Sequence, residues 1–93
     1  MEYNSSQLEK VKEYASLLMN VSDISILIGV NEDSFREDIG NKNTAASIAY
    51  RKGKIETVLE LRKQEIDMAK LGSPMAVELI QKYIIDQKMS ENG

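Results

Sequence analysis

Hydrophobic residues recur at intervals of three, four and seven along most of the chain, which is the pattern of amphipathic helices. Polar or glycine-containing segments interrupt this pattern at four places and divide the chain into five predicted helices. No segment shows a competing strand pattern, so the sequence predicts an all-α protein. We expect the helices over residues 7–19, 23–28, 32–39, 44–72 (including both caps) and 74–88.

The first three helices are short, and each has a candidate capping residue at its start. Ser6 with Glu9 has the spacing of a capping box, which satisfies two free amides at a helix N-terminus. Ser22 is the cap candidate for the second helix and Asn31 for the third. Because these helices are joined by short turns, we expect them to pack as one small group.

The stretch from residue 44 to residue 72 contains no proline and is rich in helix-forming residues, so we expect one long helix. Thr44 can cap its start, and Gly72 can take the left-handed conformation at its end. The short joint that follows, at Ser73 and Pro74, makes the last two helices antiparallel neighbours. At about 42 Å, the helix is too long for one small bundle to cover. We therefore expect part of it to face another element or another subunit.

Together the elements predict a three-helix head over residues 1–43 and a helical hairpin over residues 44–93, in one compact domain overall. Within the head, the order of residues from Val21 to Ile39 is that of a helix-turn-helix. Gly29 permits the turn between the two helices, and Phe35 anchors the helix that follows the turn, over residues 32–39. Such a unit would present Ser34 and Arg36 outward.

The third helix, over residues 32–39, is mainly acidic, which is unusual for a helix that reads DNA. Recognition helices commonly use arginine, lysine, asparagine or glutamine against bases and phosphates. Here Arg36 is the single cation among four acidic residues, Glu32, Asp33, Glu37 and Asp38. A head that packs without reading DNA is therefore an alternative interpretation.

A basic cluster lies in the first half of the long helix. Arg51, Lys52 and Lys54 place three cations within four residues around Gly53, and such a group could straddle a phosphate backbone. The alternative is a solvated helix face, with Lys52 paired to Glu56 one turn later. The spacing does not match a phosphate-binding P-loop, so no ATPase activity follows.

Composition narrows the possible functions. The chain has 93 residues, no cysteine, no histidine and a net charge of −3. Disulfides, histidine acid–base catalysis and zinc sites of sulfur or imidazole are excluded, and we expect no catalytic residues, metal or cofactor. No apolar run reaches the roughly 20 residues needed to cross a bilayer. We therefore expect a cytoplasmic protein without a membrane partner.

Three motifs resemble the small DNA-packaging proteins of phages and prophages, the terminase small-subunit type. They are GVNEDSF (residues 29–35), AYRKGKIET (49–57) and AKLGSP (69–74). The resemblance implies a non-enzymatic adaptor in the bacterial host cell that binds double-stranded DNA, forms homo-oligomeric rings and hands DNA to the large terminase subunit. It implies DNA contacts at Ser34, Arg36, Arg51, Lys52 and Lys54. The implied oligomer surface is the hairpin, with Ile55, Val58, Leu59, Ile66, Ile80 and Ile84.

Two other functions remain open from the sequence. The acidic third helix favours a protein-interaction or scaffold module that does not read DNA directly. A helix-turn-helix transcriptional regulator is the other alternative, and it would require a dimer that binds two half-sites.

Overall fold

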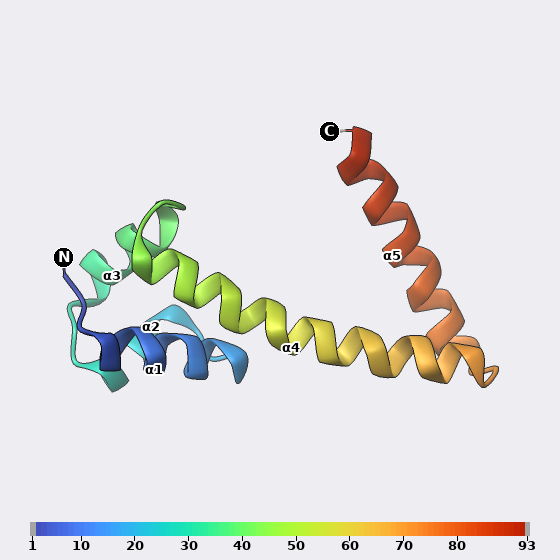
Figure 1. The fold of residues 1–93 in the computed structure, drawn as a ribbon, viewed down its shortest axis with the longest axis horizontal. Coiled ribbons are helices and arrows are strands. Elements are labelled where there is room, and N and C mark those ends of the chain that lie inside the picture. Colours follow the sequence, from blue (N-terminus) through green and yellow to red (C-terminus); the bar gives the residue numbers. More distant parts are fainter. Residues whose placement is uncertain (1, 93) are drawn as a thin grey trace. The chain divides into compact units, whose positions relative to one another are not determined.

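The computed structural model describes residues 2–92, and within that range the secondary structure is entirely helical (Figure 1). The all-α class expected from the sequence is therefore confirmed. The helices are α1 (Ser5–Ser16), α2 (Val21–Ile28), α3 (Glu32–Gly40), α4 (Ala45–Lys70) and α5 (Pro74–Asn92).

The chain forms two compact units, Met1–Val58 and Leu59–Gly93, here called the head unit and the tail unit. The boundary between them lies inside α4, whereas the sequence suggested a division between residues 43 and 44. The reason is that the first half of α4 contributes to the packing of the head, where Ala46, Ser47 and Gly53 are buried.

α1 begins two residues earlier than expected, because Asn4 rather than Ser6 is its N-cap. The Asn4 side chain accepts a hydrogen bond from the Gln7 backbone N–H at 2.8 Å. The Gln7 side chain in turn accepts one from the Asn4 backbone N–H at 3.0 Å. Residues 4 and 7 therefore form the capping box that the sequence suggested at residues 6 and 9.

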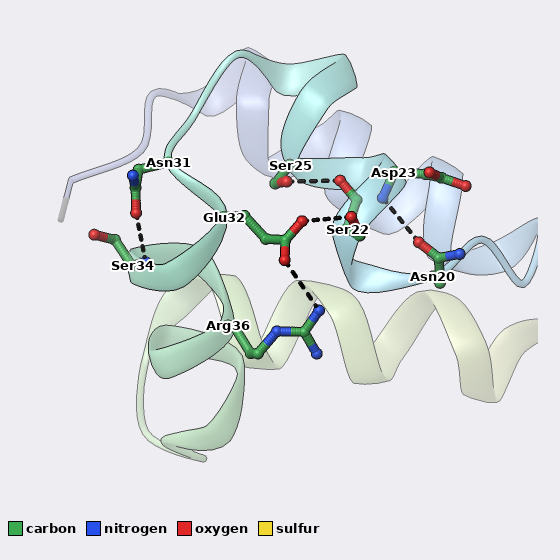
Figure 2. Close-up of polar contacts among 8 residues, drawn as sticks. All are labelled: Asn20, Ser22, Asp23, Ser25, Asn31, Glu32, Ser34 and Arg36. Carbon is green, nitrogen blue, oxygen red and sulfur yellow. Dashed lines mark hydrogen bonds and ion pairs between the residues drawn. The ribbon is translucent and has the colours of Figure 1, made fainter.

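α2 also begins earlier than expected, because Asn20 takes the capping role that was expected for Ser22. The Asn20 side chain accepts a hydrogen bond from the Asp23 backbone N–H at 2.8 Å (Figure 2). The caps predicted for the next two helices are confirmed. The Asn31 side chain caps α3 by accepting from the Ser34 backbone N–H at 3.0 Å. The Thr44 hydroxyl caps α4 by accepting from the Ser47 backbone N–H at 3.1 Å.

The core of the head unit draws residues from α1, α2, α3 and the start of α4. Tyr3 packs edge-on against Phe35, with ring centroids 6.2 Å apart, and its hydroxyl donates to Asp38 at 2.7 Å. Burial, and then this hydrogen bond, raise the pKa of Tyr3 well above its usual value. The buried apolar residues are Val11, Ala15, Ile24, Ile28, Phe35 and Ala46.

α1 and α4 come into backbone contact at Gly53. A Cβ atom at this position would lie 2.2 Å from the Lys12 carbonyl oxygen, so only glycine fits without a shift of the backbone. One turn further along α4, the Thr57 hydroxyl donates to the Ser16 carbonyl, and Glu56 pairs with Lys12 at 3.1 Å. Gly53 therefore sets how closely α4 packs in the head.

α1 ends at a residue in the left-handed conformation that is not a glycine. Leu18 has φ 61°, and the backbone N–H groups of Leu18 and Met19 bond to carbonyls of the last turn at 2.9 and 3.2 Å. At the ends of α2 and α4, Gly29 and Gly72 take the same left-handed conformation, with φ of 74° and 93°. α1 thus uses a strained leucine where α2 and α4 use glycine.

Leu18→Gly is expected to stabilise the protein by about 1 kcal/mol, because it relieves the left-handed strain of a residue with a Cβ. The leucine is 58% exposed, so little burial is lost. Leu17→Gly is the matched control, since Leu17 has φ −86° and gains nothing from glycine. Urea unfolding followed by circular dichroism measures both variants. Equal destabilisation by both would contradict the expected relief of strain.

The tail unit consists of the second part of α4 and the whole of α5, which contact each other. The Tyr83 hydroxyl donates to Glu65 of α4 at 2.5 Å, and the Arg62 guanidinium lies over the Tyr83 ring at 4.2 Å. Gly72 and Ser73 form the expected joint, and the Ser73 hydroxyl accepts from the Ala76 N–H at 3.5 Å. α5 continues to Asn92, four residues beyond the predicted end.

Candidate nucleic-acid interface and exposed apolar surface

α2 and α3 pack against each other and are joined by the turn at residues 29–31. The turn follows Gly29 in its left-handed conformation, and Asn31 then starts α3. Of the two residues expected to face DNA, Arg36 is exposed and Ser34 is half-buried. This pair of helices is the candidate reading surface of the head unit.

Glu32 of α3 bonds to α2 and also pairs with Arg36, the one cation of α3 (Figure 2). The Ser22 hydroxyl donates to one carboxylate oxygen of Glu32, and Arg36 lies 3.5 Å from the other. The Ser22 hydrogen bond, and then Arg36, lower the pKa of Glu32 below its usual value. A phosphate approaching Arg36 would therefore compete with this carboxylate.

The three cations expected to contact phosphates have different surroundings. Arg51 donates to the Lys42 carbonyl at 2.7 Å, and the Lys54 ammonium lies 5.3 Å from the centre of the Tyr50 ring. Lys52 is exposed, and it makes no ion pair or hydrogen bond with any residue that the structure describes. The three cations therefore differ in how available they are to a phosphate, and Lys52 is the least engaged of them.

The alternative pairing of Lys52 with Glu56 is not formed, because Glu56 pairs with Lys12 of α1. Lys52 instead lines a shallow hollow on the exposed side of α4, with a volume of about 460 Å³. Its apolar walls are Ile48 and Ile55, and both isoleucines are more than half exposed. This side of α4 thus places the charged side chains of Arg51, Lys52 and Glu56 beside two exposed isoleucines.

The six residues expected at the oligomer surface are largely uncovered. Ile80 is half-buried and the other five are exposed, with Ile55 the most exposed at 64%. In the tail unit, Ile66, Ile80 and Ile84 line an open groove of about 430 Å³ between α4 and α5. Arg62 and Tyr83 lie along the same groove.

The tail unit leaves most of its large apolar side chains in contact with solvent. Ala76 is the one apolar residue that is buried among those described in this unit. Exposed apolar surface of this extent is typical of a region that binds another protein. The exposed residues are Leu59, Leu61, Ile66, Met68, Leu71, Met75, Val77, Ile84, Ile85 and Met89.

Comparison of the chain with protein-family models, with curated proteins and with solved structures finds no match. The terminase resemblance therefore rests on the three sequence motifs. None of the described helices is long and apolar enough to cross a membrane.

Sequence reasoning missed two features of these surfaces. It did not connect Arg51 with the loop at residues 41–43, because the hydrogen bond joins residues nine positions apart across a turn. It also did not connect Tyr83 with α4, where the tyrosine hydroxyl donates to Glu65 and its ring lies under the Arg62 guanidinium. An arginine and a tyrosine 21 residues apart carry no local signal of such a contact.

Proposed function

We propose that this protein is a non-enzymatic DNA-binding adaptor of the terminase small-subunit type, which acts as a homo-oligomer in phage DNA packaging. The observation that carries the proposal is the contrast between the two units. The head unit has a buried core, whereas the tail unit buries only Ala76 among its described apolar residues. A tail of this kind gains its stability when other copies cover it.

The free energy available from burying the exposed apolar side chains supports assembly through the tail. Covering a large aliphatic side chain contributes about 1.5–3 kcal/mol, and the tail unit exposes several, including Ile66, Ile84 and Ile85. Their combined burial is large enough to offset the entropy lost when copies associate. The open groove between α4 and α5 provides a concave apolar surface for this contact.

In this proposal the head units bind double-stranded DNA. Ser34 and Arg36 of α3 face the duplex, and the basic residues of α4 contribute attraction to phosphates. Because α3 is mainly acidic, a single head binds weakly, and several heads held in one oligomer bind together by avidity. The large terminase subunit is the protein partner that would receive the DNA.

Fluorescence anisotropy with a generic duplex, at low and at near-physiological salt, tests the proposal when light scattering gives the mass of the same sample. We expect an oligomer whose DNA affinity falls steeply with salt, since several cations then release counterions together. A monomer that retains no DNA even at low salt would refute the adaptor function.

The acidic surface of α3 favours a second candidate, a protein-interaction module that does not read DNA. Asp33 and Glu37 are exposed on α3, and Arg36 is already paired with Glu32. The double variant Asp33→Lys/Glu37→Lys separates the two functions. It strengthens DNA binding if α3 faces DNA. It abolishes a complex with a basic partner protein, and leaves DNA binding unchanged, if α3 faces that partner.

A further inference from the structure

Arg51 fixes the loop that connects α3 to α4. Its Nη2 atom donates to the Lys42 carbonyl at 2.7 Å, and its Nε atom donates to the Ser47 hydroxyl at 3.3 Å. The Ser47 hydroxyl in turn donates to the Ile39 carbonyl at 2.9 Å, and Ser47 is fully buried. The arginine fork therefore joins the loop to a buried hydrogen bond between α3 and α4.

The rest of the loop is held by its own residues. The Thr44 hydroxyl donates to the Asp38 carbonyl at 2.7 Å, and the Asn43 N–H donates to the Asn41 side chain at 3.2 Å. Residues 41–43 are nevertheless all exposed. The loop thus combines a fixed backbone with side chains that reach the solvent.

Lys42 is the cation that this loop presents. Its side chain makes no ion pair or hydrogen bond with any residue described in the structure. It follows α3 by two residues, at the end of a helix whose own arginine is paired with Glu32. A phosphate beside α3 would therefore meet Lys42 without displacing an ion pair, unlike at Arg36.

We infer that Lys42 contacts a DNA phosphate and that Arg51 is the positioning residue that presents it. This inference rests on the proposed DNA-binding function, and it changes the role of Arg51 from a phosphate contact to a loop clamp. The two side chains suit these roles. An arginine fork makes directed hydrogen bonds to fixed acceptors, whereas a lysine is a compact, mobile charge that follows a phosphate.

Duplex binding measured by anisotropy over a range of salt concentrations tests the role of Lys42. We expect Lys42→Ala to weaken binding about tenfold at low salt and to reduce the slope of log affinity against log salt by about one. Lys10→Ala, which removes an exposed lysine of α1, is the matched control and should change neither quantity. If Lys42→Ala binds like the wild type, Lys42 is not a phosphate contact and the inference fails.

Arg51→Lys tests the positioning role, because it keeps the charge and removes the fork. We expect it to weaken binding about threefold to tenfold, and to have no further effect when combined with Lys42→Ala. Hydrogen exchange of the loop amides without DNA should become faster in Arg51→Lys, while the amides of the head core remain protected. Full affinity in Arg51→Lys together with loss of affinity in Arg51→Ala would make Arg51 a direct contact and overturn its positioning role.

The same titrations distinguish failure of the inference from failure of the proposed function. A wild-type protein that binds no duplex at any salt concentration refutes both. A wild type that binds with a steep salt dependence, together with a Lys42→Ala variant that keeps the full slope, refutes the inference alone.

Discussion

Gly53→Ala is expected to destabilise the head unit by about 3 kcal/mol, although alanine is the better helix former. Intrinsic propensity alone predicts a gain of about 1 kcal/mol at an interior helix position. The new Cβ would lie 2.2 Å from the Lys12 carbonyl oxygen, however, and this atom belongs to the backbone of α1. Because neither helix can rotate this contact away, α1 and α4 must separate and lose packing.

Gly40→Ala is the matched control for this prediction. Gly40 is the last residue of α3, and a Cβ at this position would meet no atom within 4 Å. We expect this variant to be neutral or slightly more stable. Thermal unfolding followed by circular dichroism should show a fall in Tm of about 10–20 °C for Gly53→Ala and none for Gly40→Ala. A Gly53→Ala protein as stable as the wild type would show that α1 and α4 are not held in backbone contact.

Replacing Ile66 and Ile84 together with glutamate is expected to convert the proposed oligomer into monomers of 10.5 kDa. Both isoleucines line the groove of the tail unit, and they are 41% and 46% exposed. Glutamate at these positions removes apolar surface and places charges where other copies would bind. The loss of about 4 kcal/mol of burial corresponds to association weakened by about a thousandfold. Light scattering over a dilution series measures this change directly.

Gln64→Glu is the control for the added charge, because Gln64 is an exposed residue of α4 that does not line the groove. Its oligomer mass should equal that of the wild type. The double variant should keep the thermal stability of its head unit, and it should also bind DNA more weakly because avidity is lost. An unchanged oligomer mass in the double variant would place the contact between copies on another surface.

The two predictions concern different requirements of the proposed adaptor function. Gly53 governs whether the first half of α4 packs in the head, where Arg51 holds the loop that carries Lys42. In the proposed oligomer, Ile66 and Ile84 govern whether several heads are held together. Loss of DNA binding in Gly53→Ala should therefore accompany unfolding of the head, whereas in the tail variant it should occur with a folded head.

The sequence by itself determined the helices and several of their ends. The spacing of apolar residues located each helix. Asn31, Thr44 and Gly72 have the capping roles that their residue types predicted. These features are local, since a cap bonds to an amide three residues away and a left-handed glycine depends on its own backbone. Where two residues with similar capping preferences lay close together, as with Asn4 and Ser6, the sequence led to the wrong one.

Only the tertiary structure decided which residues meet across the fold. In the sequence, Gly53 is a glycine within a basic cluster, and Arg51 is one of three equivalent cations. Packing made the first a contact point with α1 and the second a clamp on the loop before α4. Distances between segments far apart in the sequence depend on how whole helices pack, and no local pattern of residues encodes them. The uncovered apolar surface of the tail follows from the same cause, because periodicity identifies an apolar face without identifying what covers it.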